Sequence, residues 1–154
     1  MFDNTYSLEY DENITFAFDS VGPQGVIRKM VQYQRIESTD YYNLAFGDRI
    51  GNTNDIDDLV VSNNGDLQKI LSTVAQTVIT FTQQFPSASI VATGSTSART
   101  RLYRIGISKH LLAIEESFEI FGFKEDNWHK FEMNTHYEVF LIKLKKYYEN
   151  KRNE

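Results

Sequence analysis

A regular stripe of apolar residues between positions 67 and 85 constrains the fold of this chain more than any other sequence feature. Its members recur three or four positions apart, which is the spacing of one face of a helix about five turns long. They are Leu67, Ile70, Leu71, Val74, Val78, Phe81 and Phe85. Pro86 ends this helix because proline has no backbone N–H to donate. A helix with one apolar face must pack against another layer, and the remaining sequence predicts a sheet as that layer.

Short segments of alternating or continuous apolar residues predict the strands. We place them at residues 6–10, 14–18, 26–36, 44–46, 56–61, 89–93, 118–123, 128–132 and 137–144. A second helix is expected to begin near residues 95–97 and to end near Gly106, a natural helix terminator, with a shorter helix at 108–116. The predicted fold is α+β, with a single mixed, mostly antiparallel sheet and two main helices packed on it.

A length of 154 residues, of which 41% are hydrophobic, predicts a single domain with a substantial core. We divide it into a β-rich part (1–55), a strand-helix-strand-helix-strand-strand part (56–144) and a charged tail (145–154). The chain has no cysteine, which fits a reducing compartment. No apolar run approaches the length of a membrane span. We therefore expect a soluble, cytoplasmic protein.

Charge is distributed unevenly along the chain, whose formal net charge is −5. Residues 1–66 contain four Lys or Arg against twelve Asp or Glu, whereas residues 67–114 contain five Lys or Arg and no acid. The second segment therefore carries cations that have no local counter-charge. They pair either with the acidic N-terminal part or with an anion from outside the chain.

The turn and helix start at residues 94–104 form the first candidate site. Small and hydroxyl residues at a helix start offer N–H and O–H donors to an anion, and arginine recognises phosphate or carboxylate through two donors at once. The anion-binding candidates are Gly94, Ser95, Thr96, Ser97, Arg99, Arg101 and Arg104. Arg101 and Arg104 share a helix face, and Arg99 lies further round. The alternative is that the arginines pair with the acidic N-terminal part, Asp57 and Asp58 included.

A second helix start, at residues 62–66, also presents backbone amides. Asn64 and Gly65 are its candidate anion-binding residues, although Asp66 brings a negative charge to the same turn. The competing interpretation is a capped turn with Gly65 at a positive φ.

One sequence feature suggests metal binding: a group of aspartates, whose carboxylates are typical ligands of Mg²⁺ or Ca²⁺. Its members are Asp48, Asp55, Asp57 and Asp58. Their spacing fits no EF-hand, and the three histidines lack the HExxH spacing of a zinc site. We predict no metal, and expect an acidic loop balanced by arginines. No G-x-S-x-G elbow supports serine-hydrolase chemistry.

Residues 56–66 read Ile-Asp-Asp-Leu-Val-Val-Ser-Asn-Asn-Gly-Asp, and residues 92–107 read Ala-Thr-Gly-Ser-Thr-Ser-Ala-Arg-Thr-Arg-Leu-Tyr-Arg-Ile-Gly-Ile. In these segments the chain resembles an uncharacterised family of small bacterial proteins, a domain of unknown function. The likeness covers nearly the whole chain, including Asn-Leu-Ala-Phe-Gly-Asp at 43–48. This resemblance implies a family and no activity.

From residue 56 onward the expected order of elements is similar to the second half of the GNAT acyl-CoA N-acyltransferases. In that family the pyrophosphate of acyl-CoA rests on the turn before the first helix, here residues 63–66. The next helix ends in Leu-Tyr-x-x-Gly-Phe, which residues 102–107 match except for the final Ile. The resemblance implies that Tyr103 protonates the departing thiolate. The chain departs from the family in lacking the Gln/Arg-x-x-Gly-x-Gly/Ala pyrophosphate motif.

The first functional hypothesis is an anion- or nucleotide-phosphate-binding domain of GNAT-like topology, in its most specific form an acyltransferase. Its ligand is acetyl-CoA or another phosphate-bearing molecule. The alternative is a non-catalytic protein-interaction component of a bacterial regulatory, toxin–antitoxin or defence system, which an exposed aromatic patch on the N-terminal strands favours. The residues of that patch are Phe2, Tyr6, Tyr10, Phe16, Phe18, Tyr33, Tyr41 and Tyr42. Nucleic-acid binding and nuclease-like metal chemistry have less support in the sequence than these two hypotheses.

Overall fold

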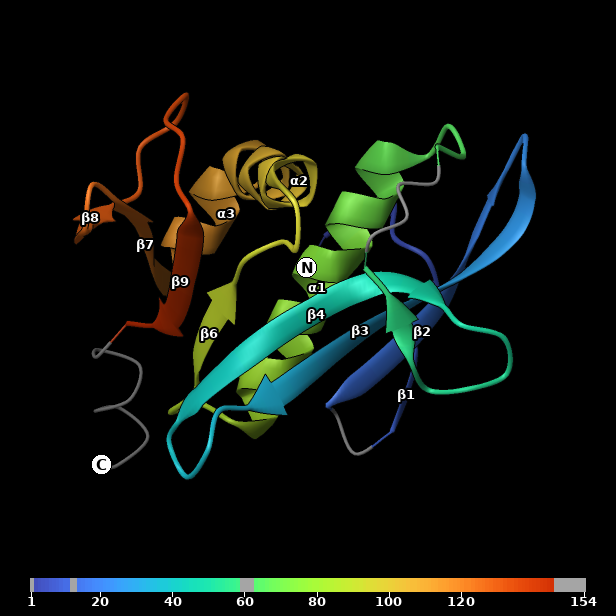
Figure 1. Cartoon of the computed structure of the whole chain (residues 1–154), viewed down its shortest axis with the longest axis horizontal. Helices are drawn as coiled ribbons and strands as arrows, with labels where there is room; N and C mark the ends of the chain where they lie inside the picture. The colour runs from blue at the N-terminus through green and yellow to red at the C-terminus, as the bar shows by residue number, and fades with distance from the viewer. Residues whose placement is uncertain (1, 12–13, 59–62, 146–154) are drawn as a thin grey trace.

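A computed structural model describes residues 2–11, 14–58 and 63–145. Within these residues the chain forms nine strands and three helices (Figure 1). The strands are β1 (Glu9–Asp11), β2 (Thr15–Gly22), β3 (Gly25–Arg35), β4 (Tyr41–Arg49), β5 (Ile56–Asp57), β6 (Ser89–Ala92), β7 (Phe118–Lys124), β8 (Asn127–Lys130) and β9 (Val139–Leu144). The helices are α1 (Leu67–Gln84), α2 (Ser97–Lys109) and α3 (Leu111–Glu115).

All of these strands belong to one sheet, in the order β1-β2-β3-β4-β6-β9-β7-β8. The short strand β5 is not part of this order and pairs with the last residues of β4. Every pair is antiparallel except β4 with β6, which is parallel. Parallel neighbours need a crossover connection, and α1 lies within the segment that provides it. The prediction of an α+β fold with one mixed, mostly antiparallel sheet and two main helices is confirmed.

The core lies between the sheet and the helices, which pack on one of its faces. Tyr33 of β3 stacks on Phe81 of α1 with ring centroids 4.1 Å apart, and Tyr42 of β4 meets the same ring edge-on at 5.0 Å. Further along the sheet, side chains of β6, β7 and β9 meet side chains of all three helices. The apolar stripe of α1 is therefore covered as its spacing predicts.

Several predicted boundaries are wrong. The helix α2 does not end at Gly106 but runs on to Lys109. A Cβ at Gly106 would lie 3.4 Å from Leu71 of α1, an ordinary van der Waals distance, so this position packs beside α1 in the interior of α2 and does not end it. The first strand begins at Glu9, because the backbone N–H of Tyr6 donates to Thr73 of α1 (2.9 Å) and not to a strand. Of the strand predicted at 56–61, β5 covers two residues, and 59–61 lie outside the described residues.

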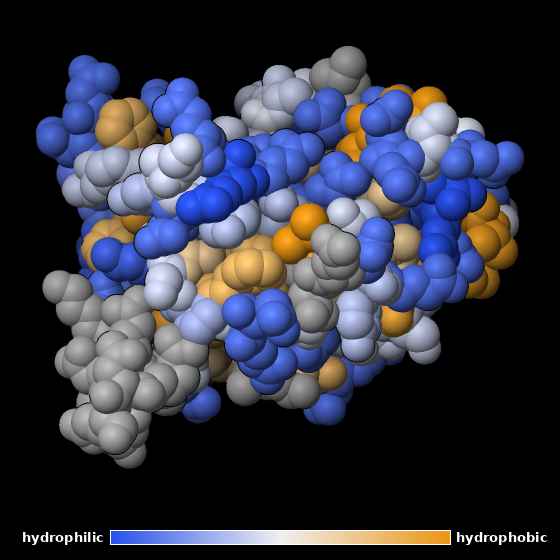
Figure 2. Space-filling model, turned by 90° about the horizontal axis from the view of Figure 1, so that it is seen from below, coloured by the Kyte–Doolittle hydropathy of each residue, from blue (hydrophilic) through white to orange (hydrophobic). Residues whose placement is uncertain are grey.

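The surface is mixed in character. The face seen in Figure 2 is mainly hydrophilic, and its apolar residues form small separate areas. None of the helices in the described part of the chain is long and apolar enough to cross a membrane.

Candidate functional site

The turn after β6 and the first turns of α2 form one wall of a surface groove of about 930 Å³. The end of β7 and the segment leading into β9 form the opposite wall. Six of the predicted anion-binding residues line this groove, namely Gly94, Ser95, Thr96, Ser97, Arg101 and Arg104. The groove therefore contains both the predicted turn and the helix face that Arg101 and Arg104 share.

At the start of α2, some backbone N–H groups are used in capping hydrogen bonds and others are not. Thr96 is the N-cap, and its hydroxyl oxygen accepts from the backbone N–H of Arg99 (3.2 Å). The hydroxyl of Thr100 accepts from the N–H of Gly94 (3.0 Å). The N–H groups of Ser97 and Ala98 have no acceptor among the described residues. These two donors, at the positive end of the helix dipole, give the groove an anion-binding end.

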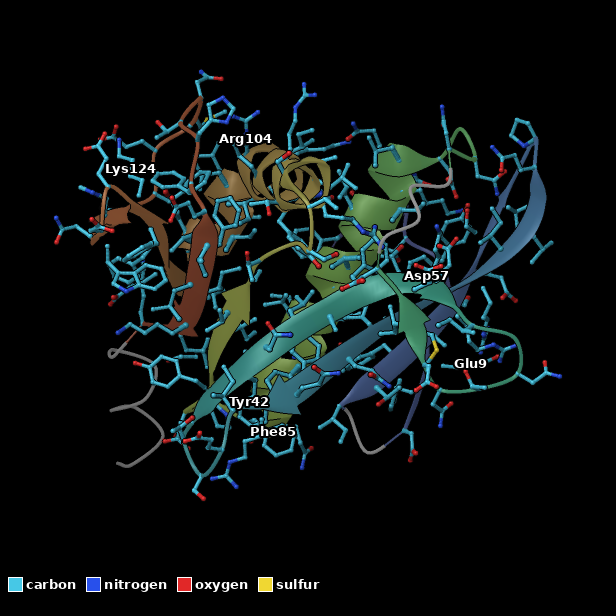
Figure 3. All side chains as sticks on the ribbon, viewed as in Figure 1. Glu9, Tyr42, Asp57, Phe85, Arg104 and Lys124 are labelled. Atoms are coloured by element: carbon cyan, nitrogen blue, oxygen red, sulfur yellow. The ribbon has the colours of Figure 1, made fainter. Side chains whose placement is uncertain are left out.

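Cations from two different elements face the groove. Arg101 and Arg104 come from α2, and Lys124 comes from the end of β7. Figure 3 shows Arg104 and Lys124 at the same end of the molecule. His136 also lines the groove, with Nδ1 3.4 Å from Nη1 of Arg104. Glu125 and Glu138 line it as well, so the groove is cationic near α2 and mixed on the far wall.

Arg99 lies apart from the other two arginines. It is buried, and it donates from Nε to the carbonyl of Asp58 (2.8 Å) and from Nη2 to the carbonyl of Phe46 (2.9 Å). This geometry matches the alternative that arginine contacts the acidic N-terminal part, with the difference that backbone carbonyls and not carboxylates accept. Arg99 does not line the groove.

Asn64 and Gly65 are likewise separated from the groove. The Asn64 side chain is buried and ties the β2–β3 turn to the start of α1, accepting from the N–H of Gln24 (2.7 Å) and donating to the carbonyl of Gly25 (3.0 Å). Gly65 has φ +73°, as the interpretation of a turn with a positive φ predicts. At α1 the N-cap residue is Asp66, whose side chain makes no capping hydrogen bond.

Tyr103, the predicted acid, does not line the groove. It borders an apolar cavity of about 60 Å³ between the helices and the sheet. Burial raises the pKa of the Tyr103 phenol to about 12, with the nearby charge of Arg99 lowering the pKa and that of Asp58 raising it. The phenol is therefore protonated near neutral pH, but it borders the apolar cavity and not the groove that the donors at the start of α2 face.

The acidic set does not assemble into a metal site among the described residues, where no group of three or more His, Asp or Glu is placed to hold a cation. Asp48 instead pairs with Lys29 of β3.

The N-terminal aromatic residues form no exposed patch. Phe16, Phe18 and Tyr33 are core residues. Three more pack against the core while partly buried, namely Phe2, Tyr6 and Tyr42. Only Tyr10 and Tyr41 of this set are largely exposed. The feature that favours an interaction protein is therefore missing from these strands.

Lys124 and His136 were not foreseen as groove residues. They are separated from α2 by more than fourteen positions, and they reach the groove because β9 inserts between β6 and β7. No local pattern around either residue signals this placement, since the pairing of β9 with β6 depends on the whole sheet.

Comparison with known proteins gives one result. No curated protein and no solved structure matches the chain, so the predicted resemblance to GNAT acyltransferases finds no support. The model of one protein family matches residues 3–145. The chain thus belongs to DUF6934, a family of unknown function.

Proposed function

We propose that the groove at the start of α2 binds a phosphate-bearing small molecule. The observation that carries this proposal is a convergence on one groove. The backbone N–H groups of Ser97 and Ala98, which find no acceptor in the described part of the chain, meet there with Arg101 and Arg104, and Lys124 joins them from another element. Each of these groups prefers an anionic oxygen, and arginine adds a planar pair of donors that fits phosphate.

The arrangement favours a ligand with more than one charged group. A helix rises about 1.5 Å per residue, so Arg101 and Arg104 lie roughly 6 and 10 Å along the axis from Ser97. A single phosphate contacts only part of that length. A groove of about 930 Å³ also has room for more than an inorganic anion. A nucleotide or a coenzyme A species fits both the charge and the size.

The test is a thermal-shift screen with ATP, NAD, CoA, acetyl-CoA, inorganic phosphate and short DNA and RNA. A ligand that binds only the native state, at a hundred times its Kd, stabilises it by about 2.7 kcal/mol. At about 2–4 °C per kcal/mol this shift is easily measured. We expect a shift with a di- or triphosphate ligand and its loss in the Arg101→Ala, Arg104→Ala double variant.

A matched control is the Arg35→Ala, Lys109→Ala double variant, which removes two exposed cations outside the groove. It should keep the full ligand-induced shift. Equal loss in both double variants would mean that the shift reflects overall charge and would contradict the proposal. A nucleic-acid shift that salt removes would instead assign the arginines to a nucleic-acid backbone.

Acyl transfer is the most specific form of this proposal, and it rests on the sequence pattern around Tyr103 alone. A shift with acetyl-CoA would justify an assay of acyl transfer to amines. Unchanged turnover in Tyr103→Phe would remove Tyr103 from the chemistry, as its position in an apolar cavity leads us to expect.

The competing proposal is a protein-interaction component of a bacterial regulatory, toxin–antitoxin or defence system. No exposed aromatic patch on the N-terminal strands favours it. Absence of any shift across the ligand screen would make it the better account.

A further inference from the structure

His136 is held in place on the wall of the groove that faces the first turns of α2. The two residues that follow it are fixed by burial and by hydrogen bonds. Tyr137 is buried in the core. The backbone N–H of Glu138 donates to the carbonyl of Phe123 (2.8 Å), and the carbonyl of Glu138 accepts from the hydroxyl of Thr93 (2.9 Å). The backbone that carries the imidazole is therefore held beside the turn that precedes α2.

The imidazole contacts a cation that has no carboxylate partner. Nδ1 of His136 lies 3.4 Å from Nη1 of Arg104, a half-buried arginine of α2. Among the described residues this is the only hydrogen bond of the Arg104 side chain, and no carboxylate forms an ion pair with it. Because a guanidinium only donates, Nδ1 is the acceptor, which requires a neutral ring with its proton on Nε2. The neutral form of His136 thus engages a cation of the groove.

The other charged groups of the groove surround this contact. Arg101 comes from α2 and Lys124 from the end of β7, and Glu125 and Glu138 lie on the wall that carries His136. Carboxylate, ammonium and guanidinium groups ordinarily keep their charge between about pH 6 and 8, where imidazole gains or loses a proton. Among these groups, the imidazole is therefore the one through which pH can act.

We propose that His136 makes anion binding in the groove depend on pH, an inference that rests on the proposed function above. The neutral imidazole accepts from Arg104. The protonated imidazole has no free lone pair at Nδ1, so it releases Arg104 and becomes a further N–H donor to an anion. Without a ligand the two adjacent cations repel each other, and a phosphate that contacts both relieves this repulsion. Binding and protonation therefore favour each other, so affinity rises as pH falls.

The experiment is a calorimetric titration of the full chain with ATP at about pH 8 and about pH 6. The terminal phosphate of ATP also titrates in this range, so the wild type is compared with His136→Gln, which meets the same ligand but has no imidazole to protonate. The ratio of the Kd at the higher pH to the Kd at the lower pH should be about three to five times larger in the wild type, the effect of one exposed ion pair. The wild type should also take up more protons on binding, which heats in buffers of different ionisation enthalpy measure.

Two further variants separate charge from other effects. His136→Lys carries a permanent charge at the same position, so it should bind ATP more tightly than His136→Gln at both pH values, with the pH dependence of His136→Gln. His110→Gln removes a histidine that does not line the groove and should keep the pH dependence of the wild type.

The outcomes distinguish this inference from the proposed function. Equal pH dependence in the wild type and in His136→Gln, with ATP bound by both, would overturn the inference and leave the proposed function intact. An equal loss of pH dependence in His110→Gln would show that protonation acts through the fold and would also overturn it. Absence of ATP binding to the wild type at both pH values would overturn the inference together with the nucleotide form of the proposed function.

Discussion

At the scale of single residues, the sequence predicted the chemistry of the arginines better than their positions. Arg99, Arg101 and Arg104 lie within six positions of one another, but a turn of about 100° per residue sends Arg99 to a different face of α2. The helical pattern placed Arg101 and Arg104 together and Arg99 further round. It could not show that Arg99 is buried against β4, because Gly47 and the carbonyl of Phe46 come from a strand distant in sequence.

Gly122 in β7 shows a residue-scale requirement that no local pattern reveals. A Cβ at this position would lie only 2.3 Å from ring atoms of Tyr137, which is buried. We expect Gly122→Ala to lower the free energy of unfolding by about 1–3 kcal/mol, the usual cost of overpacking a core. Denaturant titration of the variant measures this loss.

The double variant Gly122→Ala, Tyr137→Ala separates steric conflict from other causes, because alanine lacks the Cγ and Cδ1 atoms that the added Cβ would meet. Because the smaller side chain relieves the clash, the double variant should lose less stability than the sum of the single losses. Strict additivity would contradict the steric explanation.

At the scale of elements, apolar spacing located α1 within one residue at its start, since Leu67 begins both the stripe and the helix. The C-terminal end of α2 was harder to predict from the sequence. Glycine commonly ends a helix, but Gly106 lies inside α2, beside Leu71 of α1. That packing depends on tertiary structure, so the sequence pattern does not reveal it. The bend falls instead at His110, which separates α2 from α3.

His110 makes the junction of α2 and α3 sensitive to pH. Its Nε2 lies 3.2 Å from the hydroxyl of Ser72, and its ring meets Phe2 edge-on. Burial, and secondarily the charge of Lys109, lower the pKa of His110 from its ordinary value of 6.5. The unfolded chain therefore binds this proton more readily, so stability falls as pH drops below about 6.5.

The measurement is the free energy of unfolding of the wild type and of His110→Gln, at about pH 7.5 and about pH 5.5. The wild type should lose more stability on acidification than the variant, which has no imidazole to protonate. Parallel losses would show that other groups, such as the carboxylates, account for the whole effect.

At the scale of the whole molecule, composition and pattern predicted the α+β class, but the order of strands depends on pairings between distant segments. β4 pairs with β6, and β9 inserts between β6 and β7. Hairpins such as β2–β3 follow from adjacent segments and a turn at Pro23 and Gln24. The insertion of β9 has no comparable local signal, and it is this insertion that brings Lys124 and His136 to the groove.

A continuous sheet predicts a single unfolding transition. Trp128, the only tryptophan, reports on β8 at one edge of the sheet. A fluorophore attached to Tyr10→Cys reports on β1 at the other edge, in a chain that has no other cysteine. Denaturant curves from the two probes should coincide. A lower midpoint at Tyr10→Cys would divide the chain into two units and contradict the prediction of a single domain.

The parallel pair of β4 and β6 also matters while the chain is being synthesised. The strands up to β4 can pair as soon as they emerge, but one edge of β4 waits for β6, which follows only after the 18 residues of α1. During that interval the edge is a template for any passing strand. The order of the elements therefore gives the nascent chain a period of exposure to aggregation that ends when residues 89–92 leave the ribosome and dock.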